Sequence, residues 1–86
     1  MTYTIRFDES AEDDLKSLSE KLTERIYTKL EMLSQNPYGL KSKSITNTPF
    51  RRIRIGDYRV IYMVSNEEVI ITIIKIGHRK NVYKNL

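Results

Sequence analysis

The chain of 86 residues contains no cysteine, only two prolines and three glycines, and a single histidine. The absence of cysteine excludes disulfide bonds and thiolate metal sites, so we expect the fold to depend on one small apolar core. The glycines are not clustered, which argues against a glycine-rich nucleotide-binding loop. No apolar run approaches the length of a membrane span, and the first residues lack the pattern of a secretory signal. We therefore expect a cytoplasmic protein with no membrane partner.

The charge is unevenly distributed along the chain. Residues 1–35 carry five Lys and Arg against eight Asp and Glu, a net charge of −3, whereas residues 36–86 carry ten against three, a net charge of +7. A basic half of a small domain favours a polyanion such as a nucleic acid as partner. The alternative is a lysine-rich surface that only contacts water.

The first half of the chain alternates in the manner of a strand over residues 3–7 and then shows helical spacing. Asp8 or Ser10 is expected to cap the first helix, and Thr23 the second. The second helix should end near Asn36, because Pro37 disfavours helical geometry in the residue before it. The apolar positions that recur at helical spacing are Ala11, Leu15, Leu18, Leu22, Ile26, Leu30 and Leu33.

The second half begins with a polar loop over residues 37–49 and continues with three strand-like runs, at residues 50–55, 58–64 and 69–76. We therefore predict one domain over residues 1–86 with an α+β fold. It should consist of an N-terminal strand, two antiparallel helices and a mainly antiparallel sheet that a three-stranded C-terminal meander completes.

The first hairpin of this meander defines a charged face. Gly56-Asp57 suits a two-residue turn, which places Ile55 opposite Tyr58 and Arg54 opposite Arg59. Because side chains alternate across a sheet, Arg52 joins these two arginines on one face, and the apolar residues occupy the other. Like charges directly opposite one another are destabilising, so this pairing indicates a functional demand.

Extending the register through the second turn is expected to place Val64 opposite Val69 and Arg59 opposite Ile74. Gly77 should then let the chain turn toward the hairpin arginines. The arginine face would gain an apolar floor, which a protein partner could cover. The residues expected on this face are Ile61, Met63, Ile70, Ile74, Ile76 and His78, with Arg79 and Tyr83 close by.

The carboxylates and the single histidine of the chain limit the reactions that it could catalyse. The basic half has only Asp57, Glu67 and Glu68 as carboxylates, all in predicted turns, which argues against a metal site or another cofactor. One histidine excludes an acid–base pair of two histidines. Metal-free cleavage of RNA remains, in which the 2′-hydroxyl attacks and arginines stabilise the phosphate charge. A plain nucleic-acid binder could carry the same groups.

Two sequence runs resemble the RelE/ParE toxin superfamily, and within it the RelE-like ribosome-dependent mRNA interferases. They are Arg-Ile-Arg-Ile-Gly-Asp-Tyr-Arg-Val-Ile-Tyr at residues 52–62 and Ile-Gly-His-Arg-x-x-Val-Tyr at residues 76–83. A Phe7-Asp8-x-x-Ala11 junction adds to the resemblance, which covers nearly the whole chain. It implies a RelE-like fold and the toxin of a type II toxin–antitoxin module. It also implies cleavage of mRNA on the ribosome, leaving a 5′-hydroxyl and a 2′,3′-cyclic or 3′ phosphate.

The resemblance also implies roles for individual residues. Arg59 matches the arginine that contacts the scissile phosphate, Arg79 the one assigned to charge stabilisation or leaving-group protonation, and Tyr83 the proposed general base. Arg52 and Arg54 stand where relatives often have lysines, so the positive charge is kept but a group that exchanges protons more readily is lost. Related proteins have His or Lys at the position of His78, whose role stays open between catalysis and support. The further positions expected to bind RNA are Lys41, Lys43 and Lys80.

The implied partners are a small acidic antitoxin, the ribosome and mRNA, and operator DNA for the toxin–antitoxin complex. Two alternatives remain open. One is a ParE-like poison of DNA gyrase, and the other is an inactive member that only binds antitoxin or nucleic acid.

Overall fold

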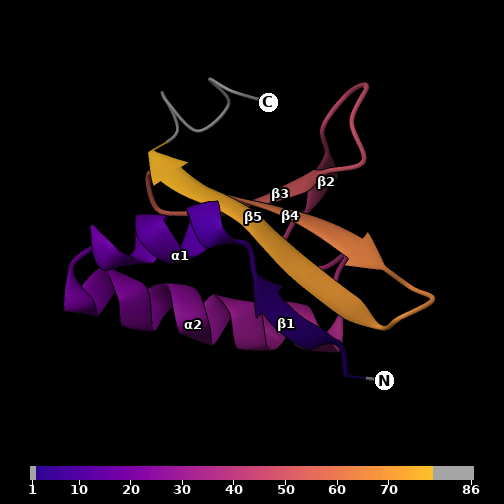
Figure 1. Cartoon of the computed structure of the whole chain (residues 1–86), viewed down its shortest axis with the longest axis horizontal. Coiled ribbons are helices and arrows are strands. Elements are labelled where there is room, and N and C mark those ends of the chain that lie inside the picture. Colours follow the sequence, from indigo (N-terminus) through magenta and orange to yellow (C-terminus); the bar gives the residue numbers. More distant parts are fainter. Residues whose placement is uncertain (1, 79–86) are drawn as a thin grey trace.

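The computed structural model describes residues 2–78, which form two helices on one five-stranded sheet (Figure 1). In chain order the elements are β1 (Thr4–Phe7), α1 (Glu9–Lys16), α2 (Glu20–Gln35), β2 (Lys43–Ser44), β3 (Arg51–Ile55), β4 (Tyr58–Ser65) and β5 (Ile70–His78). The strand order is β1-β5-β4-β3-β2. Only β1 and β5 pair in parallel, so the predicted α+β class and mainly antiparallel sheet are confirmed.

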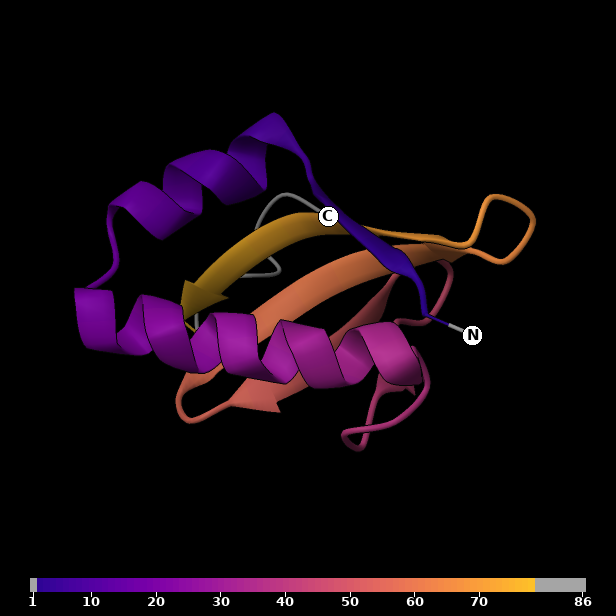
Figure 2. The same ribbon diagram turned by 90° about the horizontal axis from the view of Figure 1, so that it is seen from below.

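Both helices lie on the same side of the sheet, where α2 crosses the strands and α1 runs beside the end of β5 (Figures 1 and 2). The core lies between these two layers. The buried residues that form it are Ala11, Ile26, Leu30, Leu33, Ile53, Ile55, Val60, Tyr62, Ile71, Ile73 and Ile76. The other side of the sheet, here called the outer face, is covered by neither helix of residues 2–78.

The helix boundaries agree with the apolar spacing except at the junction between the helices. Ser19, not Thr23, is the N-cap of α2, and its hydroxyl accepts a hydrogen bond from the Leu22 N–H at 3.2 Å. Leu18 lies in the connection between the helices, so the predicted apolar stripe of the first helix extends beyond the end of α1. The helix α2 ends at Gln35, with Asn36 as its C-cap, in agreement with the end near Asn36 that Pro37 predicts.

The first hairpin has the predicted register. Ile55 pairs with Tyr58, Arg54 with Arg59, and Arg52 with Ile61. Gly56 has a φ of 61°, which glycine adopts without the steric cost of a Cβ atom. The tight turn therefore fixes the three arginines on the outer face.

The predicted register of the second hairpin is wrong. Val64 pairs with Ile71, and Arg59 pairs with Gly77. The turn includes Val69 in a left-handed conformation with a φ of 58°, and β5 carries one extra residue opposite the step from Ile61 to Tyr62. A bulge of this kind arises where β4 and β5 pair in the folded sheet. The hydrophobic pattern of the five isoleucines in β5 does not reveal it.

Two expected members of the outer face therefore lie elsewhere. Ile76 pairs with Val60 and is 3% exposed, as part of the core. His78 pairs with Tyr58, so alternation places its side chain toward the helix layer and not toward Arg59. Gly77 does not end the strand either, since β5 continues to His78.

The end of β5 is held by a carboxylate of α1. The strand β1 ends opposite Ile73, so it offers no backbone partner to the following residues of β5. There Asp14 Oδ2 accepts the Ile76 N–H at 2.8 Å and lies 3.9 Å from Lys75 Nζ. The helix thus replaces the missing strand neighbour at this point.

We expect Asp14→Ala to lower the free energy of unfolding by about 1 kcal/mol, because the Ile76 N–H loses its partner. Chemical denaturation would measure this change. Asp13→Ala is the matched control, since Asp13 is 67% exposed and only reaches Lys16 at 3.8 Å. Equal losses in both variants would contradict a specific role of Asp14.

Candidate functional site

Four basic side chains lie in two like-charged pairs across neighbouring strands of the outer face. Arg54 is opposite Arg59 on β3 and β4, and Lys43 is opposite Arg52 on β2 and β3. The two ion pairs among the described residues involve Lys16 and Lys75, so neither pair of the outer face is neutralised there. This concentration of uncompensated positive charge favours a bound anion.

Two of these arginines line a groove of about 480 Å³. Its lining consists of Arg52 and Arg59 from the sheet, and Ser44, Ile45 and Thr46 from β2 and the loop that follows it. The strand β2 was not predicted, because it has only two residues within a polar loop. Its pairing with β3 is what brings this loop beside the arginines.

Arg59 has the most unusual environment in the groove. Its Nε and Nη1 atoms are buried and have no hydrogen-bond partner in the part of the chain that the structure describes. Buried polar groups are normally paired, and an unpaired charged donor is costly. Together with the repulsion from Arg54, this geometry indicates a site prepared for an anionic ligand such as a phosphate group.

The loop that precedes β2 is anchored by residues that the sequence did not single out. The Tyr62 side chain is fully buried, and its hydroxyl donates to the Pro37 carbonyl at 2.6 Å and contacts the Ser42 hydroxyl. Arg51 donates through Nε to Ser42 Oγ at 2.8 Å, and its guanidinium lies 4.9 Å from the centre of the Tyr38 ring. Arg51 therefore holds the loop, whereas Arg52 and Arg59 face the groove.

The remaining predicted positions are only partly brought together. Lys41 is exposed in the loop before β2 and does not line the groove. The His78 ring makes an edge contact with Tyr58, with 5.8 Å between ring centroids, on the strand positions that face the helices. Arg79, Lys80 and Tyr83 lie outside the described residues.

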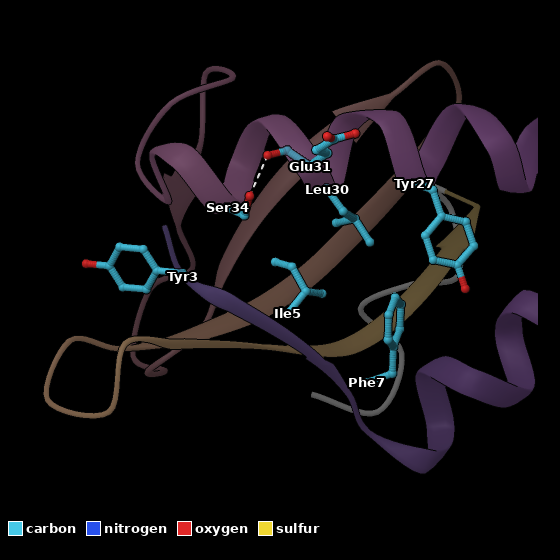
Figure 3. A pocket seen from close by; sticks show the side chains of 7 residues that line it. All are labelled: Tyr3, Ile5, Phe7, Tyr27, Leu30, Glu31 and Ser34. Atoms are coloured by element: carbon cyan, nitrogen blue, oxygen red, sulfur yellow. Dashed lines mark hydrogen bonds between the residues drawn. The ribbon is translucent and has the colours of Figure 1, made fainter. Parts of the chain in front are cut away.

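The apolar floor expected on the outer face is smaller than predicted. Ile61 alternates to that side but is fully buried, and Met63 is 37% exposed. An apolar hollow of about 350 Å³ lies between β1 and α2, on the helix side of the sheet (Figure 3). Ile5, Phe7, Tyr27 and Leu30 point into it, and the ring of Tyr27 contacts that of Phe7 edge-on.

Residues 2–78 show neither a cluster of metal ligands nor a membrane-spanning helix. No group of three or more His, Asp or Glu side chains is placed to hold a metal ion there. Within the same residues, neither helix is long and apolar enough to cross a membrane.

Comparison with known proteins gives a consistent assignment. Residues 5–83 match the family model described as the ParE toxin of the type II toxin–antitoxin system parDE. The chain belongs to the RelE/ParE superfamily of type II toxins. It is thus the toxin of a toxin–antitoxin system, as the resemblance implied.

Individual relatives agree with this assignment. The toxin is 27% identical to the mRNA interferase toxin RelE of Escherichia coli K12 over 82 residues, which covers 93% of this chain and 86% of that protein. It is 30% identical over 89 residues to a putative toxin RelE1 of Methanocaldococcus jannaschii, with 99% of both chains covered.

Solved structures show the same fold. The RelBE2 toxin–antitoxin complex of Mycobacterium tuberculosis contains a chain with a TM-score of 0.85 and 26% identity, covering 92% of this toxin and 93% of that chain. The archaeal RelE–RelB complex of Pyrococcus horikoshii gives a TM-score of 0.78 and 28% identity, with 92% and 97% covered. The expected RelE-like fold is therefore confirmed.

Proposed function

We propose that this toxin is a metal-independent endoribonuclease that cuts mRNA on the ribosome and so halts translation in the cytoplasm. The observation that carries the proposal is the groove of Arg52 and Arg59, where two buried guanidinium nitrogens of Arg59 have no partner among the described residues. The E. coli relative is named an mRNA interferase, which supports RNA as the substrate.

The reaction is a transesterification within the RNA, in which one phosphorus–oxygen bond forms and another breaks. The 2′-hydroxyl oxygen attacks the adjacent phosphorus, and the bond from phosphorus to the 5′-oxygen breaks, which leaves a 2′,3′-cyclic phosphate and a 5′-hydroxyl. Arg59 and Arg52 stabilise the negative charge that grows on the phosphate oxygens. An arginine suits this task because its planar guanidinium stays charged and offers two parallel donors.

Two proton transfers complete the reaction. Tyr83 takes the proton of the 2′-hydroxyl, and Arg79 supplies or stabilises the proton on the departing 5′-oxygen. These two assignments rest on the family resemblance. His78 loses its support as a proton donor, because its strand position faces away from Arg59.

A cognate antitoxin is the second part of the proposal. The solved relatives described above are complexes with RelB antitoxins. The net charge of +4 on this toxin favours an acidic partner. Binding of operator DNA by the resulting complex is a further expectation.

Mapping of mRNA ends in a bacterial translation extract tests the enzymatic proposal. We expect the wild-type toxin to produce new 5′-hydroxyl ends at ribosome-occupied codons. Arg79→Ala should reduce their yield by about 10² or more, because one group that acts only in the transition state is lost. Lys21→Ala, an exposed substitution on α2 with the same change in charge, should cut as the wild type does.

The other outcomes identify the alternatives. Intact mRNA together with trapped gyrase–DNA complexes would replace the proposal with a ParE-like activity. Intact mRNA without such complexes would leave a protein that only binds. Equal cleavage of naked RNA and ribosome-bound mRNA would contradict the ribosome dependence.

A further inference from the structure

The groove on the outer face has two chemically different sides. Among the described residues that line it, Arg52 and Arg59 carry the charge, and a neutral wall consists of Ser44, Ile45 and Thr46. A phosphate engages the guanidinium groups, whereas neutral hydroxyl and aliphatic side chains are suited to contact a ribose or a base. The wall therefore has the chemistry to recognise the nucleoside next to a bound phosphate.

The size of the groove agrees with this division. A volume of about 480 Å³ lies within the range of pockets that enclose whole small molecules, so it exceeds the need of a phosphate alone. The loop after β2 rises from the outer face, away from the helices (Figure 1). A nucleotide whose phosphate sits on Arg59 would thus meet this loop with its sugar or base.

The wall is held in shape by its own hydrogen bonds. The Ile45 N–H donates to the Phe50 carbonyl at 3.0 Å, and the Ile45 carbonyl accepts from the Thr48 hydroxyl at 2.8 Å. The Thr48 hydroxyl in turn accepts the Phe50 N–H at 3.1 Å. A contact surface that is ordered before binding loses less entropy when a ligand arrives.

Thr46 is a polar group of this wall that is available to a ligand. It is exposed, it follows Ile45 directly, and no hydrogen bond within the described residues occupies its hydroxyl. Threonine hydroxyls both donate and accept, so they pair with base edges and with the 2′-hydroxyl.

We propose that Ile45 and Thr46 form a nucleoside subsite, which selects the nucleotide beside the phosphate on Arg59 and so sets the sequence preference of cleavage. The inference rests on the proposed function for its place in the reaction. The subsite itself requires only that the arginine groove binds a nucleotide.

Titration of the isotope-labelled toxin with inorganic phosphate and with the four 3′-ribonucleoside monophosphates tests the subsite without any cleavage. Inorganic phosphate should shift the signals of Arg52 and Arg59 alone. At least one nucleotide should also shift the amides of Ile45 and Thr46, and should bind roughly fivefold more tightly than the weakest of the four.

Thr46→Val keeps the shape of the side chain and removes its hydroxyl. We expect this variant to reduce the spread among the four affinities to about twofold or less, while inorganic phosphate binds as before. Thr4→Val, an exposed threonine on the edge strand β1, is the matched control and should keep the wild-type spread. Four equal affinities in the wild type, or an unchanged spread in Thr46→Val, would overturn the subsite.

Cleavage mapping separates this inference from the proposed function. If the wild type cuts mRNA, Thr46→Val should redistribute the cuts among codons, and an unchanged pattern would refute the role in specificity. If the wild type cuts no RNA, the proposed function and the role in specificity both fail. Base-dependent binding would then still support a nucleoside subsite, whereas its absence would refute the subsite as well.

Discussion

Replacement of Arg59 by methionine should abolish most of the activity and leave the fold intact. We expect Arg59→Met to lower the rate of mRNA cleavage by about 10² to 10³, because the groove loses a donor aimed at the charge of the transition state. The side-chain stem and its packing are retained. Cleavage kinetics in a translation extract, with the toxin in excess of ribosomes, would measure the loss.

The stability of the same variant distinguishes function from folding. Nε and Nη1 of Arg59 are buried without a partner among residues 2–78, and Arg54 lies directly opposite. Removing this charge should leave the melting temperature unchanged or raise it, as expected where a functional site is maintained at some cost in stability. Lys21→Met removes one exposed charge from α2 and should change neither quantity. A lowered melting temperature of Arg59→Met would show that the arginine serves the fold.

Tyr62→Phe should lower the stability of this toxin markedly, although it removes only one hydroxyl. The missing hydroxyl leaves the Pro37 carbonyl without its donor and breaks the contact with Ser42, which also accepts from Arg51. We expect the free energy of unfolding to fall by about 1–3 kcal/mol. Urea denaturation would measure it. Proteolysis within residues 37–50 should also become faster, because the loop loses its buried anchor.

Tyr27→Phe is the matched control for this prediction. Tyr27 is 51% exposed, and no hydrogen bond to its hydroxyl occurs within the described part of the chain. Its substitution should change the free energy of unfolding by less than about 0.5 kcal/mol. If both variants lose the same stability, the hydroxyl of Tyr62 does not anchor the loop.

The first hairpin could be predicted from the sequence because its determinants are local. Gly56 supplies the positive φ of a two-residue turn, and that turn fixes the pairing of Arg54 with Arg59. The arginine half of the candidate site follows from this register. Composition alone would have indicated only a basic protein.

The second hairpin could not be predicted, because its register depends on two features without a sequence signal. Val69 adopts a left-handed backbone that a β-branched residue rarely takes, and β5 bulges opposite the step from Ile61 to Tyr62. The bulge adds one residue to β5, so Ile76 lies in the core and His78 pairs with Tyr58.

The sequence by itself determined the α+β class, the cationic hairpin and the resemblance to RelE-type toxins, since these depend on periodicity, one turn and short motifs. Only the tertiary structure decided what surrounds the arginines. The pairing of β2 with β3 brings Ile45 and Thr46 to the groove, and the fully buried Tyr62 holds the preceding loop. These contacts join residues distant in the chain, and their geometry depends on how the sheet is assembled.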